Sequence, residues 1–198
     1  MLEKYIINHG SPTLCGEKIA NLINVNSSFL SIKEINKLNI MLNKYDMHIY
    51  LLKNNKLSTL LYLFNIVKLT KRLNLTSTRK FLSKYSYPLN DTFETLKHLQ
   101  YRILNNSEFP HEIGIFLDYP LSDVEEYIIN KGKNSLLTGT WKVYSNLEYA
   151  KKKFLSFQEC TNFCKYHYNI GFNLEFILNK YKGVNNEKIS SCILDWNR

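Results

Sequence analysis

The sequence predicts a mostly helical α+β protein with a small antiparallel sheet. Long stretches of its 198 residues combine helical periodicity with helix-capping residues, whereas two short apolar runs within residues 47–64 are typical of a β-hairpin. Helices and strands do not alternate strictly, so a parallel doubly wound sheet is not expected. No repeat or Pro/Gly-rich linker divides the chain, and we expect a single domain over residues 1–198.

Two helices are expected before the hairpin. Ser11 followed by Pro12 is typical of a helix start, with serine as the N-cap and proline at the first helical position. Apolar residues at helical spacing then extend to Ile23. The second helix begins at the capping-box pair Ser31 and Glu34 and extends to about residue 45.

The sheet is expected to contain three strands. Asn54 and Asn55 separate the two runs of the hairpin at residues 47–64, and asparagine tolerates the positive φ of a tight turn. A later strand is expected at about residues 138–144, where Trp141 and Val143 alternate with more polar neighbours. This strand can join the hairpin to complete a small antiparallel sheet.

Helices are expected again after the hairpin. A basic helical stretch over residues 68–84 ends near Pro88, and a further helix is expected from about residue 91 to 104. Pro110 is expected to open a short helix, which Pro120 closes.

Three more helices are expected towards the C-terminus. Ser122 and Glu125 repeat the capping-box pattern, and Gly132 is a plausible C-cap for the helix that they open. Asn146 is expected to cap a long helix that extends to about residue 167. A shorter helix is expected at about residues 172–180, and the tail from about residue 182 is expected to be loose.

The composition indicates a cytoplasmic protein with reduced thiols. No apolar run reaches the ~18 residues that a spanning helix needs, and the first residues lack the pattern of a secretory signal, so no membrane partner is expected. The four cysteines are too sparse and too irregularly spaced for a disulfide framework.

The net charge of +9 raises a nucleic-acid-binding hypothesis. Lysine makes up most of the 26 basic residues, whereas specific phosphate and base contacts favour arginine, so a solvated basic surface is the preferred interpretation. A nucleic-acid-binding module would use Lys68, Lys71, Arg72, Arg79, Lys80 and Lys84. A third hypothesis is an interaction adaptor whose basic helix meets an acidic partner, such as a redox protein.

A first candidate site lies at the expected helix start after residue 10. Free backbone N–H groups of the first turn would converge with the hydroxyls of Ser11 and Thr13 on one anion pocket, within reach of His9. The alternative is an ordinary helix start beside a surface histidine. Cys15 is a weak candidate nucleophile, and a small buried residue is the preferred interpretation for it.

A second candidate site lies at the start of the short helix. There the helix dipole favours the carboxylate of Glu112 and the neutral, proton-accepting form of His111, so the two could act as acid and base. Alternatively, Glu112 only caps the turn and His111 bonds a neighbouring loop.

A metal centre and a nucleotide site have little support. Cys160, Cys164 and His167 share one helix face, but they lack a fourth ligand and a C-x-x-C knuckle, so packing is the preferred interpretation and no metal is expected. None of the common nucleotide-binding and zinc-protease motifs occurs, and the sequence therefore names no cofactor.

Three phrases in the chain resemble a family of clostridial and related Firmicute proteins, domain of unknown function 3793. They are HGSPTLCGEKIANL, FPHEIGIFLDYPLSDVEEYI and TGTWKVYSNLEYAKKKF, in that order. The resemblance spans nearly the whole chain and implies no activity. It matches His9, Ser11 and Thr13, but the family commonly has alanine at Cys15 and glycine at Asp118.

These observations favour a protein that binds a small anionic ligand or cofactor. The expected pocket lies between the two helix starts and uses His9, Ser11 and Thr13 from one and His111 from the other. If the protein is an enzyme, His9, His111 and Glu112 would be its acid and base, although no reaction is indicated.

Overall fold

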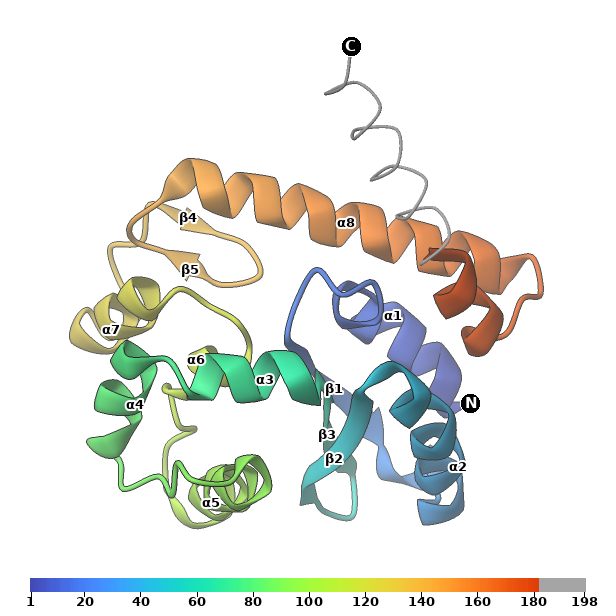
Figure 1. The fold of residues 1–198 in the computed structure, drawn as a ribbon, viewed down its shortest axis with the longest axis horizontal. Coiled ribbons are helices and arrows are strands. Elements are labelled where there is room, and N and C mark those ends of the chain that lie inside the picture. Colours follow the sequence, from blue (N-terminus) through green and yellow to red (C-terminus); the bar gives the residue numbers. More distant parts are fainter. Residues whose placement is uncertain (182–198) are drawn as a thin grey trace.

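A three-stranded antiparallel sheet lies between two layers of helices (Figure 1). The structure is a computed structural model and describes residues 1–181. The strands are β1 (Ala20–Asn26), β2 (Met47–Asn54) and β3 (Ser58–Asn65), in the order β1-β3-β2. The prediction of a mostly helical α+β fold with a small antiparallel sheet is therefore confirmed.

The central strand β3 contributes to two separate hydrophobic cores because successive side chains point to opposite faces of a sheet. Leu61 and Leu63 pack into the first core, whereas Tyr62 and Phe64 pack into the second. All four side chains are fully buried. This explains why β3 has a continuous apolar sequence and not an alternating one.

The first core joins both ends of the described chain. It is covered by α1 (Leu2–Leu14), α2 (Ile32–Leu42), the long α8 (Leu147–Asn169) and a helical segment at residues 174–181. The predicted cap of α2 is confirmed, because the Ser31 hydroxyl accepts a hydrogen bond from the Glu34 amide. Two 3-10 turns, Ser27–Phe29 and Asn43–Tyr45, connect these elements to the sheet.

The second core lies on the other face of the sheet. It is covered by α3 (Ile66–Leu73), α4 (Thr76–Ser83), α5 (Thr92–Asn105), α6 (Ile113–Phe116) and α7 (Leu121–Ile129). Asn65 and Asp91 cap α3 and α5 with their side chains. The Tyr62 hydroxyl donates to the Phe116 carbonyl at 2.6 Å, which ties the sheet to α6.

The strand predicted at about residues 138–144 does not join the hairpin. Its residues form a separate two-stranded ribbon of β4 (Leu137–Thr138) and β5 (Lys142–Val143). The ribbon packs through Trp141 and Val143 on the first turns of α8, in a small third core. The third strand of the main sheet is β1.

The prediction that a helix starts at Ser11 is wrong. Residues 2–14 form α1, so Pro12 lies in the last turn of a helix and not in its first. Residues 20–26, predicted as the continuation of that helix, are strand β1, whose buried Ala20, Ile23 and Val25 pack on both sides of the sheet. Pairing with β3 along its whole length stabilises β1 as a strand.

Two local details also differ from the prediction. Neither Asn54 nor Asn55 has a positive φ, and the hairpin turn is made instead by the Asn55 side chain, which accepts from the Leu57 and Ser58 amides. Ser122 does not cap α7, since the helix begins at Leu121. The tail predicted to be loose lies outside the described residues.

Candidate functional site

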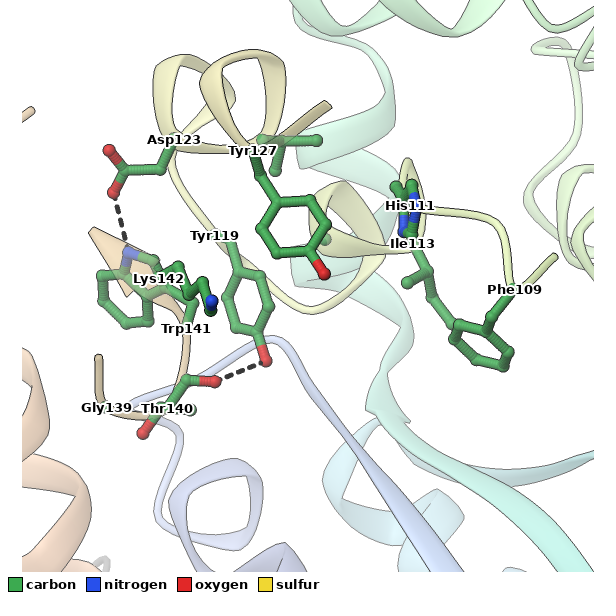
Figure 2. Close-up of a pocket in the computed structure, with 12 residues that line it drawn as sticks. Phe109, His111, Ile113, Tyr119, Asp123, Tyr127, Gly139, Thr140, Trp141 and Lys142 are labelled. Carbon is green, nitrogen blue, oxygen red and sulfur yellow. Dashed lines mark hydrogen bonds between the residues drawn. The ribbon is translucent and has the colours of Figure 1, made fainter. Parts of the chain in front are cut away.

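A pocket of about 310 Å³ lies between α6, α7 and the turn that joins β4 to β5. Its walls are mainly aromatic and aliphatic. Figure 2 shows Tyr119 and Trp141 along one side and His111 with Phe109 on the other, with Tyr127 between them. The lining residues are Phe109, His111, Ile113, Gly114, Tyr119, Asp123, Val124, Tyr127, Gly139, Thr140, Trp141 and Lys142.

Asp123 fixes the ribbon against α7 and so closes one wall of the pocket. One carboxylate oxygen accepts from the Trp141 indole at 2.7 Å. The other accepts from the amides of Tyr144 and Ser145 and from the Ser145 hydroxyl, at 2.9 to 3.0 Å. Four donors satisfy the acceptor sites of this buried carboxylate, so Asp123 is a structural acid rather than a free one.

Contacts of Tyr119 with Trp141 and Thr140 also hold this wall of the pocket in place. Their rings stack with centroids 5.4 Å apart, and the Tyr119 hydroxyl donates to the Thr140 carbonyl at 3.0 Å. Burial raises the pKa of Tyr119 to about 12, so this hydroxyl stays a donor at neutral pH. The buried ammonium of Lys18 lies 5.1 Å from the centre of the Tyr119 ring.

Two glycines are required by the close packing of the walls. A Cβ atom at Gly114 would lie 2.6 Å from a methyl group of Val124, and one at Gly139 would overlap the Phe154 ring. Gly114 therefore lets α6 and α7 approach each other, and Gly139 lets the β4–β5 turn lie on α8. Asp118, just before Tyr119, has φ +68°, the left-handed conformation that glycine adopts most easily.

Two further polar side chains at the pocket, Lys142 and His111, can donate hydrogen bonds to a ligand. The Lys142 ammonium donates a hydrogen bond to the Gly132 carbonyl at 2.5 Å. The exposed imidazole of His111 meets the Tyr127 ring edge-on, with centroids 5.1 Å apart. Since Asp123 is already saturated, no unpaired carboxylate lines this pocket within the described residues.

The two residues predicted at the short helix take different positions. His111 lines the pocket, whereas Glu112 is buried behind it. The Glu112 carboxylate pairs with Arg102 at 2.5 Å and accepts from the Tyr87 hydroxyl at 3.1 Å. Burial and this carboxylate raise the pKa of Tyr87. Arg102 and Tyr87 therefore hold Glu112 behind the pocket, whereas His111 lines it.

The predicted pocket between two helix starts is not formed. His9, Ser11 and Thr13 lie in the C-terminal half of α1, where the backbone N–H groups are used inside the helix. Ser11 and Thr13 are fully buried, and their hydroxyls donate to the Ile7 carbonyl and to Asn21. His9 is exposed, and none of the three lines the pocket at His111.

The six basic residues of the nucleic-acid hypothesis lie on α3, α4 and the residue after α4, but half of them are used inside the fold. Lys68, Arg72 and Arg79 each donate to a backbone carbonyl, of residues 16, 119 and 89 respectively. Lys71 and Lys80 are exposed, and Lys84 lies 3.8 Å from a carboxylate on α7. They do not present six free cations.

The predicted soft-ligand set on α8 has other partners. Cys160 and Cys164 are buried, and His167 bonds the Phe163 carbonyl through Nδ1 at 2.9 Å. Over residues 1–181, no group of three or more His, Cys, Asp or Glu side chains is arranged to bind a metal ion. Over the same residues, no helix has the length and apolar character needed to cross a bilayer.

Sequence reasoning missed most of the pocket. The sequence pattern predicts a strand at Trp141 and Lys142 and a helix at Tyr127, and it does not mark these residues as part of a site. The available signal was the pair of motif phrases, because all lining residues fall within residues 109–128 and 138–154.

Comparisons with known proteins identify the family of the chain but no activity or ligand. No curated protein and no solved structure matches the chain. One family profile matches residues 6–178, a range that includes every residue of the pocket. The chain therefore belongs to the family described as protein of unknown function (DUF3793).

Proposed function

We propose that this protein binds a small anionic molecule with a flat apolar body in the pocket beside His111. The observation that carries the proposal is the combination of aromatic walls with unopposed donors. Trp141 and Tyr119 offer stacking surface, while Lys142 and His111 offer charge and hydrogen bonds to an acidic group. The lining carboxylate, on Asp123, has both oxygens occupied by hydrogen bonds from the fold, so it does not compete with a ligand for the donors at Lys142 and His111.

The size of the pocket limits the ligand. A volume of about 310 Å³ lies at the lower end of the range for small-molecule sites, roughly 300–1,000 Å³. It suits a compact molecule and not a dinucleotide. The net charge of +9 favours the approach of anions from solution.

Lys142 is the residue that we expect to recognise the acidic group. Its ammonium rests on one backbone carbonyl, and an ammonium can donate three hydrogen bonds. An incoming carboxylate or phosphate can therefore be bound without breaking the existing contact. The proposal names binding and no reaction, because Glu112, the expected partner of His111 in acid–base chemistry, is paired with Arg102.

Native mass spectrometry of gently purified protein tests this proposal. We expect a discrete small-molecule adduct that Lys142→Met loses and His111→Ala weakens. Lys80→Met, which removes an exposed lysine on α4, is the matched control and should retain the adduct. An adduct of equal abundance in all variants would place the ligand elsewhere.

A probe pair gives a second test that does not depend on co-purification. Benzoate and benzamide have similar shapes, but only benzoate is charged. In ligand-observed NMR, benzoate should show saturation transfer that Lys142→Met reduces, and benzamide should show less. Equal signals from both probes would contradict recognition of an anion.

The cytoplasm is the setting that we propose for this binding. What supports it is that Cys15, Cys160 and Cys164 are free thiols, which persist in reducing compartments. We propose neither nucleic-acid binding nor an adaptor role, since Arg72 and Arg79 serve the fold and no specific observation favours an acidic partner.

A further inference from the structure

Three thiols meet in the first core, between α1 and α8. Cys15 follows the last residue of α1, and its Sγ lies 3.7 Å from the Sγ of Cys164 on α8, although the two are 149 positions apart in sequence. Cys160 lies one turn earlier on the same face of α8. Their exposed fractions are 8%, 1% and 2% for Cys15, Cys164 and Cys160.

We propose that Cys15 and Cys164 are a covalent-modification site, a thiol pair that peroxide converts into a disulfide linking α1 to α8. A disulfide places its sulfur atoms about 2.05 Å apart, so the two Sγ atoms must approach by about 1.7 Å. Cys15 is well placed to move, because α1 ends there and Gly16, with φ +76°, opens the connection to β1. Figure 1 shows α1 lying beneath α8, where such a link would join them.

Packing explains part of this arrangement but not all of it. Cysteine is a small apolar residue that is often buried, which accounts for each thiol taken singly. It does not require that thiols from two distant helices meet sulfur to sulfur. Hydrogen bonds with the neighbouring thiols and burial raise the pKa of Cys15, whereas the hydrogen bond with Cys15 lowers the pKa of Cys164, so Cys164 is the thiol expected to react first.

The chemistry is balanced with hydrogen peroxide as the oxidant, which is small enough to reach a nearly buried sulfur. The Cys164 thiolate attacks one peroxide oxygen, and the O–O bond breaks to give a sulfenic acid and hydroxide, which takes up the thiol proton as water. The Cys15 sulfur then displaces the sulfenic oxygen, which leaves as a second water. Two thiols lose two electrons, and one peroxide is reduced to two waters.

Peptide mapping of the full chain tests the site. The reduced protein is treated with hydrogen peroxide, alkylated and digested without reductant. We expect a linked peptide pair containing Cys15 and Cys164, lighter by two hydrogen atoms and lost on treatment with dithiothreitol. Oxidation should also raise the Tm by several degrees, because the link constrains the unfolded chain.

Matched variants separate this pair from the other thiols. The link should persist in Cys160→Ala and in Cys192→Ser, and Cys15→Ala should lose it, with circular dichroism as the check on folding. If Cys15→Ala does not fold, the map of the unaltered chain decides. Continued alkylation of Cys15 and Cys164 after peroxide, their conversion to sulfinic acids, or links made only by Cys192 would overturn the proposal. The result does not depend on ligand binding at His111.

Discussion

Replacement of Lys18 by methionine is expected to stabilise the protein at neutral pH. Lys18 is only 3% exposed, and its ammonium faces the rings of Tyr119 and Phe157, at 5.1 and 5.8 Å from their centres. No hydrogen bond or ion pair to this ammonium is formed within the described residues. Burial therefore lowers the pKa of Lys18 from 10.5 to about 8, and the charge of Asp118 offsets this only in part.

The pKa sets both the sign and the size of the effect. Because the folded state has the lower pKa, the unfolded chain binds more protons between pH 8 and pH 10.5, and the free energy of unfolding rises with pH in that window. The pKa difference corresponds to about 3 kcal/mol. Below pH 8 the folded protein bears this whole penalty, and above pH 10.5 it bears none.

Urea unfolding followed by circular dichroism, from pH 7 to pH 10.5, measures the penalty. Lys18→Met keeps the apolar stem without the charge, so at pH 7 it should exceed the unaltered protein in stability by up to about 3 kcal/mol. The difference between the two proteins should shrink as pH rises. Lys71→Met controls for the loss of an exposed lysine. A stability difference that stays constant across this pH range would refute the reasoning.

Three further changes should alter the fold or the pocket in measurable ways. Asp123→Ala leaves buried donors unpaired and should lower the free energy of unfolding in urea by about 3 kcal/mol. The fluorescence of Trp141 should also change. Unchanged stability would contradict the structural role of this carboxylate. Gly139→Ala forces a Cβ into the Phe154 ring and should lower the free energy of unfolding by about 1–3 kcal/mol. Unchanged stability of this variant would contradict the close contact between the β4–β5 turn and α8. Tyr62→Phe removes the hydrogen bond to the Phe116 carbonyl and should lower the free energy of unfolding by about 1–2 kcal/mol, measured against the exposed control Tyr166→Phe.

Elements with their own start and stop signals could be predicted from the sequence. The caps Ser31 and Asn146 and the turn after residue 54 give local information, and the helices and the hairpin that they delimit are present. The prediction for the first 26 residues was wrong because long-range packing, and not local signals, determines their structure. Ser11 and Pro12 imitate a helix start, but Leu2 and Ile6 bury α1 in the first core, and this burial outweighs the local preference. β1 pairs with a strand more than thirty residues later, which a local pattern does not reveal.

The pocket could be predicted only in part, because its parts come together through long-range contacts. His111 lies in a segment where proline and glycine mark the ends of a short helix, and this position makes it a candidate site residue. Asp123 reads as an ordinary acidic residue in the first turn of a helix, since its partners at Trp141 and Ser145 lie 18 and 22 residues away. Lys142 reads as the polar side of a strand, and only the fold brings it to the pocket.

The two cores are completed at different times during synthesis on the ribosome. The second core is built from residues 19 to 128, so it can close before the last third of the chain has emerged. The first core uses Leu2 and Ile6 from α1 but also Cys164 and Ile177 from the C-terminal part. α1 can pack early on β1 and α2, but the part of its apolar side that contacts α8 stays uncovered on the nascent chain until α8 is translated.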